Sequence, residues 1–149
     1  MPTPVQNLGL ALSPNLRLDA AQQRRVEQVL DRLGLGGLGQ RRPGDVSGGQ
    51  QGRAALGRAL LQARPLLLLD EPFAALGPAL KADLLRLVAE MAAEAGTTVL
   101  LVTHDPQDAR RFADLTSVVA EGIAAAPLPT LALFADPTPA LAEYLGPAG

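Results

Sequence analysis

The residues best suited to chemistry stand in three short clusters, and the first is Val46-Ser47-Gly48-Gly49-Gln50 at an expected helix start. Unpaired backbone N–H groups, the helix dipole and the serine hydroxyl can converge there on an anion. Glycines would let a phosphate come close. A Ser-Gly-Gly turn that only caps a helix is the alternative, and for the tripeptide alone it is the more common case. The cluster therefore indicates an anion site only in combination with its surroundings.

The second cluster is Asp70-Glu71-Pro72, which follows the apolar run Leu66–Leu69. Open α/β sheets place their ligand sites at such carboxyl ends of strands. If the two side chains diverge as in a strand, Asp70 can hold Mg²⁺ through water while Glu71 orients or polarises an attacking water. A polar strand end without function would be the better explanation if this pair stood alone.

The third cluster is Thr103-His104-Asp105, which follows a second apolar run and contains the only histidine of the chain. A lone histidine is usually structural. Here, however, three polar clusters all fall at the expected end of a strand or beginning of a helix. Their convergence on one anion site is a better explanation than coincidence.

The elements that must position these clusters follow from periodicity, caps and breakers. Helices are expected from Asp19 to Leu33, from about Ser47 to Ala63, and from Pro78 to Ala95. The last has an apolar stripe, formed by Leu80, Leu84, Leu87, Val88, Met91 and Ala95. Parallel strands covered on both faces are expected at Leu66–Leu69 and Thr98–Thr103. This strand, helix and strand predict an α/β fold with a right-handed crossover.

Shorter elements are expected in the last third of the chain. They are a helix from Asp105 to Ala113, an extended segment Ser117–Ala120, a turn at Glu121-Gly122, a strand Ile123–Ala126, and helices around Leu131 and Leu141.

Composition excludes several classes of protein. The 149 residues are 48% hydrophobic, which argues against a disordered tail, and the net charge of −2 provides no basic field for nucleic acid. No cysteine is present, so disulfides and thiolate metal sites are excluded. Apolar runs are too short to cross a bilayer. We therefore expect a domain with an aliphatic core and no nucleic-acid partner.

The three clusters, together with Arg53, Ala55-Leu56, Arg58-Ala59-Leu60 and Ala75-Leu76, resemble the motifs of ABC transporter ATPases in order and spacing. The resemblance implies an α/β fold: a partial P-loop NTPase of the RecA-like, ABC ATPase type, with a parallel sheet and a helical subdomain at the N-terminal side. Residues 1–63 would form that subdomain, ending in the signature helix. Residues 64–149 would form the C-terminal part of the RecA-like core.

The resemblance also implies roles and partners. Ser47, Gly48, Gly49 and Gln50 would contact ATP held by a second ABC ATPase subunit in a head-to-tail dimer. In their own subunit Asp70 would serve Mg²⁺, and Glu71 and His104 would be catalytic. Permease subunits would be further partners, at the cytoplasmic face of a bacterial membrane. The opening stretch, Val5–Leu10 and Leu18–Gln22, most closely resembles ATPases that serve thiamine uptake.

Two motifs of the family are missing. The 149 residues contain no Gly-x-x-x-x-Gly-Lys-Ser/Thr, the sole lysine is Lys81, and the glutamine loop is absent. We expect a fragment, from a start placed too far downstream or a truncated gene, with negligible ATPase activity alone. The rival hypothesis is a non-catalytic module that docks on an intact ABC ATPase and supplies only the signature motif in trans. A plain α/β domain with chance motifs is a third.

Departures from the family pattern favour decay. They are Gly52, Gly57, Ala74 and Gly77, where the family usually has Gln, Ala, Ser and Asp. A glycine inside a helix costs up to about 1 kcal/mol relative to alanine. Without the P-loop strand beside it, the run Val99–Val102 is expected to become an exposed apolar edge.

Overall fold

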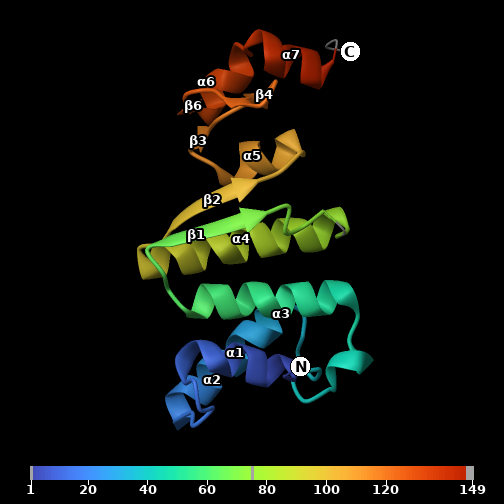
Figure 1. Ribbon diagram of the computed structural model, residues 1–149, viewed down its shortest axis with the longest axis vertical. Helices are drawn as coiled ribbons and strands as arrows, with labels where there is room; N and C mark the ends of the chain where they lie inside the picture. The colour runs from blue at the N-terminus through green and yellow to red at the C-terminus, as the bar shows by residue number, and fades with distance from the viewer. Residues whose placement is uncertain (1, 75, 147–149) are drawn as a thin grey trace. The chain divides into compact units, whose positions relative to one another are not determined.

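The chain passes from three N-terminal helices through a parallel strand pair to a region of short elements (Figure 1). The structure is a computed structural model and describes residues 2–74 and 76–146. The chain divides into two compact units, Met1–Val102 and Thr103–Gly149. Each unit is described by itself.

The first unit opens with helices α1 (Pro4–Leu12), α2 (Ala20–Arg32) and α3 (Gly48–Leu61), with a short 3₁₀ turn η1 (Pro43–Asp45) before α3. All three α-helices begin with the same device, in which the cap side chain and the side chain three residues later each accept a hydrogen bond from the other's backbone N–H. The predicted cap Asp19 is confirmed. The fully buried Leu8, Val26 and Leu33 form the core of this helical part.

The rest of the first unit is the predicted strand, helix and strand. Strands β1 (Leu66–Asp70) and β2 (Thr98–Val102) pair in parallel, from Leu66 opposite Thr98 to Asp70 opposite Val102. Helix α4 (Pro78–Ala95) joins them and ends at Gly96, whose φ of 64° is the left-handed conformation that glycine adopts easily. Both figures show α4 running along the strand pair.

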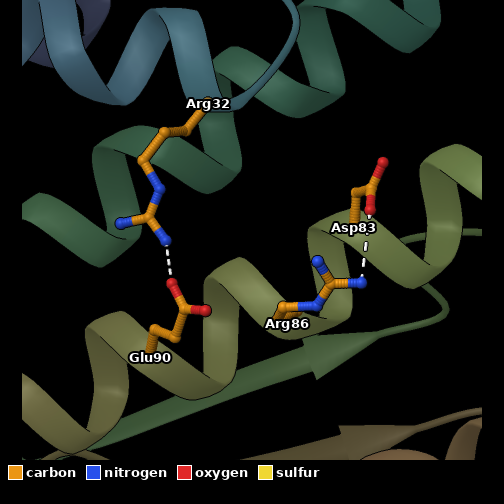
Figure 2. A network of polar contacts seen from close by, with 4 residues as sticks. All are labelled: Arg32, Asp83, Arg86 and Glu90. Atoms are coloured by element: carbon orange, nitrogen blue, oxygen red, sulfur yellow. Dashed lines mark hydrogen bonds and ion pairs between the residues drawn. The ribbon is translucent and has the colours of Figure 1, made fainter.

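Helix α4 buries most of the predicted apolar stripe. Leu84, Leu87, Val88 and Met91 are buried, as expected, and so are Leu85 and Ala92. Leu80 is half-buried and Ala95 is exposed, because the stripe ends one turn before the helix does. Two salt bridges involve α4: Arg32 of α2 pairs with Glu90, and Arg86 pairs with Asp83 at 3.5 Å (Figure 2). All four side chains are well exposed, so these pairs add little stability.

The strand pair is covered on one face only, which corrects the expectation that both faces are buried. Leu69 is buried, and Leu67, Val99 and Leu101 are half-buried. On the other face the side chains are more than half exposed: Leu66, Leu68, Leu100 and Val102. The sequence pattern belongs to strands with two covered faces, whereas the described residues supply a cover for one. Of the run Val99–Val102, which is expected to be exposed, only every second side chain is exposed. The exposed apolar surface continues onto β1.

The second unit contains α5 (Pro106–Phe112), two antiparallel strand pairs and two short helices. The pairs are β3 (Leu115–Thr116) with β6 (Leu128–Pro129), and β4 (Val119–Ala120) with β5 (Ile123–Ala124). Helices α6 (Thr130–Ala135) and α7 (Pro139–Leu145) follow. Each expected short element is present, although the strands have only two residues.

The units differ from the domains expected from the sequence. The sequence predicts a boundary between residues 63 and 64, whereas the compact units divide after Val102. Helix α3 and the strand pair fall in the same unit, and the subdomain boundary at residue 63 stays a prediction. Among residues 2–74 and 76–146, no helix combines the length and the apolarity that crossing a bilayer requires.

Gly57 lies in a close packing contact, which the expectation from helix propensity alone does not take into account. A Cβ added at this position would lie 2.5 Å from Leu33 Cδ1 and 3.2 Å from Leu8 Cδ2, both of which belong to fully buried side chains. At Gly52 an added Cβ would meet nothing within 4 Å. Gly57 therefore permits the close approach of α3 to α1 and to the end of α2, whereas no contact among the described residues requires glycine at position 52.

These two glycines give a matched pair of variants with opposite expected effects. Gly52→Ala should stabilise the chain by up to about 1 kcal/mol through helix propensity. Gly57→Ala should destabilise it by about 1–2 kcal/mol, because overpacking outweighs the same propensity gain. Urea unfolding followed by circular dichroism measures both. Equal stabilisation by the two variants would contradict the packing role.

A second pair of variants tests the one-sided cover of β1. Leu69→Ala should cost about 2–5 kcal/mol, since it empties a buried position. Leu68→Lys should change stability by less than about 0.5 kcal/mol and should reduce aggregation, because that side chain is 64% exposed. Chemical unfolding and light scattering provide the measurements. A large loss of stability in Leu68→Lys would show that the outer face is covered.

Candidate functional site

The beginning of α3 is built around Ser47, the predicted cap residue. Its hydroxyl accepts a hydrogen bond from Gln50 N at 3.3 Å, and Gln50 Oε1 accepts one from Ser47 N at 2.7 Å. Buried Val46 precedes the cap and holds the entering chain. The N–H groups of Gly48 and Gly49 lie in the first turn, where a helix offers no acceptor of its own. No acidic side chain occupies that turn, so the positive end of the helix dipole is not neutralised locally.

The space over the first turn of α3 is open. A Cβ added at Gly48 or Gly49 would meet nothing within 4 Å, and both residues are exposed together with Ser47. Neither has a positive φ, so the fold of the chain does not require glycine there. Two glycines nevertheless cost helix stability, up to about 1 kcal/mol each relative to alanine. The arrangement can accept an anion from outside, with backbone N–H groups and the serine hydroxyl as donors.

Asp70 and Glu71 lie at the carboxyl end of β1, as predicted. Asp70 pairs with Val102, and the backbone N–H of Glu71 donates to Val102 O at 2.9 Å, one step beyond the ladder. Glu71 has a φ of 44°, a left-handed conformation that costs a non-glycine residue on the order of 1–2 kcal/mol. The expected divergence by strand alternation therefore does not apply, because Glu71 lies past the strand. Both side chains are exposed.

The donors at this strand end suit Mg²⁺ in part. Carboxylate oxygens are its preferred protein ligands, and such sites use one or two of them plus water and phosphate oxygens. Within the described part of the chain, no group of three or more His, Cys, Asp and Glu side chains is placed to hold a metal ion. Asp70 and Glu71 alone therefore supply fewer ligands than Mg²⁺ requires, and the rest would have to be water or oxygen atoms of a ligand.

His104 belongs to the second unit, whose first residues form a tight polar turn. Thr103 Oγ1 donates to Asp108 Oδ2 at 2.7 Å and accepts from Asp105 N at 3.1 Å. Asp105 caps α5 by accepting from Gln107 N at 2.9 Å, as its sequence position predicts. The hydroxyl of Tyr144 donates to the backbone carbonyl of His104. The His104 side chain is exposed.

Two of the three predicted clusters belong to elements of the first unit. In the first unit, α3 begins and β1 ends on the same side of the view in Figure 1, so Ser47–Gln50 and Asp70-Glu71 belong to elements that reach a common side. His104 follows Val102, the partner of Asp70, by two residues in the chain. Ala75, part of the Ala75-Leu76 motif in the family resemblance, lies outside the described residues.

Sequence reasoning missed two residues around His104. Asp108 is 4% exposed, an unusual burial for an acid, and Tyr144 is the only tyrosine of the chain. A carboxylate three residues after a helix cap would ordinarily be assigned to the exposed first turn. The spacing of Thr103 and Asp108 is the only sequence signal for their hydrogen bond. No local pattern indicates the hydrogen bond from Tyr144 to His104.

Known proteins with similar sequences belong to one family. Residues 3–74 match the family described as ABC transporter. The thiamine import ATP-binding protein ThiQ of Cereibacter sphaeroides is 68% identical over 142 residues, which are 95% of this chain and 62% of that protein. Its namesake from Ruegeria is 56% identical over 141 residues, 95% of this chain and 61% of that protein. The chain thus spans about three-fifths of the length of these relatives.

A solved structure described as an inward-facing conformation of a metal-chelate type ABC transporter shows the same fold. It superposes with a TM-score of 0.68 and 24% identity, over 88% of this chain and 53% of that one. The predicted α/β fold is confirmed, because the chain shares its fold with part of this ABC transporter structure. The matched family region contains the signature cluster and the Asp70-Glu71 cluster, and by its sequence the chain belongs to the family of ABC transporter ATP-binding proteins.

Proposed function

We propose that this chain is part of an importer ATPase that couples ATP binding and hydrolysis to solute uptake. The cargo that we infer is thiamine, which appears in the names of the relatives with 68% and 56% identity. In this proposal a second ABC ATPase subunit and transmembrane permease subunits are the partners. The chain works as a peripheral protein at the cytoplasmic face of the bacterial membrane.

The observation that carries the proposal is the open first turn of α3. Gly48 and Gly49 leave room that none of the described residues fills, and Ser47 stands beside two N–H groups that need an acceptor. A phosphate of ATP held by the other subunit would satisfy these donors. Bound nucleotide would then favour closure of the pair, because its phosphates are attracted to the positive end of α3.

The remaining site residues have roles in their own subunit. Asp70 would hold Mg²⁺ through water, and the ion would neutralise charge on the phosphates when bound. Glu71, fixed by its bond to Val102 O, would orient the attacking water and take its proton. His104 would contact the terminal phosphate from the turn after β2. Each role needs a nucleotide held by a phosphate-binding loop.

A second candidate function follows from the absence of that loop among the 149 residues. A polypeptide of these residues would then be a non-catalytic module that completes the site of an intact subunit. Only Ser47–Gln50 would act in this case, because their task is done in trans. In the first candidate function the residues are part of a catalytic subunit, and in the second they form a non-catalytic module. In both, the first turn of α3 contacts a phosphate of ATP held by another subunit.

A complementation assay tests the shared part. The intact partner is the Cereibacter sphaeroides relative with its signature serine changed to aspartate, so that its own dimer has no functional signature. Adding this chain should restore ATP hydrolysis, because α3 supplies the missing donors. The chain alone should neither hydrolyse ATP nor bind a fluorescent ATP analogue with Mg²⁺ at micromolar concentrations. Binding by the chain alone, or no restored hydrolysis, would contradict the proposal.

Two variants of Ser47 separate its capping role from its proposed phosphate contact. Ser47→Ala should cost about 1 kcal/mol of stability, since it removes the cap. Ser47→Asp should keep the stability, because aspartate caps equally well. It should nevertheless lower the restored ATPase activity about tenfold to a hundredfold, because a carboxylate replaces a donor to phosphate. If Ser47→Asp restores hydrolysis fully, Ser47 is only a cap.

A further inference from the structure

We infer that Tyr144 is a positioning residue for His104: its hydroxyl, presented by α7, holds the histidine's backbone carbonyl. The importance given to His104 rests on the proposed function, whereas the contact itself does not. Tyr144 lies 40 residues after His104 in the chain, so the bond ties the end of the second unit to its first turn.

The turn around His104 is fixed on its other side as well. Thr103 Oγ1 bonds both to the buried carboxylate of Asp108 and to the backbone N–H of Asp105, which brackets the histidine. The 4% exposure of Asp108 excludes most water from this contact, which strengthens it. Tyr144 donates to the backbone carbonyl of His104, so α7 holds the same turn from a second direction.

Helix α7 is built to present the tyrosine hydroxyl. Leu141 is 6% exposed and anchors the helix, and Tyr144 follows three residues later, which places it on the same helix face. The helix ends directly afterwards at Gly146, with a φ of 73°. The tyrosine is 60% exposed, so its ring contributes little to the core. Its placement is explained by the hydroxyl contact better than by burial.

The physical consequence concerns the backbone of an exposed catalytic candidate. Fixing one residue in a single backbone conformation costs about 1–2 kcal/mol of entropy. If contacts within the unit already hold the His104 backbone in one conformation, phosphate binding does not have to supply this entropy. Tyr144 would thus act on His104 through its peptide group, without touching the nucleotide.

The composition of the chain makes the test direct, because it has one histidine and one tyrosine. Labelling histidine with ¹³C at the carbonyl gives a single resonance, which is the acceptor itself. In Tyr144→Phe we expect this resonance to move upfield, and the heteronuclear NOE of the lone ¹⁵N-labelled histidine amide to fall. Glu143→Gln, an exposed neighbour on α7, is the matched control and should leave both unchanged.

If Tyr144 only stabilised the fold, Tyr144→Phe would lower the thermal midpoint and would leave the His104 carbonyl resonance unchanged. The positioning role predicts the opposite pattern. Tyr144→Phe should leave the thermal midpoint within a few degrees, since the ring stays and is mostly exposed. In the unmutated chain, NOEs should connect the tyrosine ring to the backbone around His104, which requires no variant. Absence of these NOEs, or an unchanged carbonyl resonance in Tyr144→Phe, overturns the inference. No nucleotide or partner is used, so this outcome is independent of the complementation assay.

Discussion

The close packing of α3 over Gly57 is the contact on which the rest depends. At that point α3 meets the buried side chains of Leu8 and Leu33, and the missing Cβ lets the helices approach. This approach fixes the axis of α3, and the axis determines where its first turn points. Ser47 and Gln50 then fix the backbone of that turn through reciprocal hydrogen bonds. A phosphate-binding end is useful only if it is rigid, because each loose donor must be ordered on binding.

Much of the first unit could be predicted because its signals are local. Asp19 and Ser47 cap helices, Gly96 ends one, and Leu66–Leu69 forms a strand, as propensity and spacing indicate. The burial of the strand pair could not be predicted in the same way. Continuous apolar runs are typical of strands with two covered faces. Such a run does not show whether both covering layers are present in the folded chain.

The errors concerning single residues have a common physical cause. Gly57 looks like a defect when only helix propensity is considered, and its value depends on two side chains from other helices. Strand alternation predicts that the side chains of Asp70 and Glu71 point to opposite faces. Glu71 lies one residue past the strand and has a positive φ, so this rule does not hold for it. Asp108 and Tyr144 act through contacts that only the folded second unit creates. In each case tertiary contact, which sequence spacing does not encode, outweighed the local rule.

The central claim is that the first turn of α3 receives a phosphate held by another subunit. Photolabelling tests it most directly, with an ATP analogue whose reactive group sits on the terminal phosphate. The chain is mixed with an intact ATPase subunit, irradiated and digested, and the label is mapped by mass spectrometry. The account predicts label within residues 47–50 only when the intact subunit is present. Label elsewhere in the chain, or equal labelling without the partner, would contradict it.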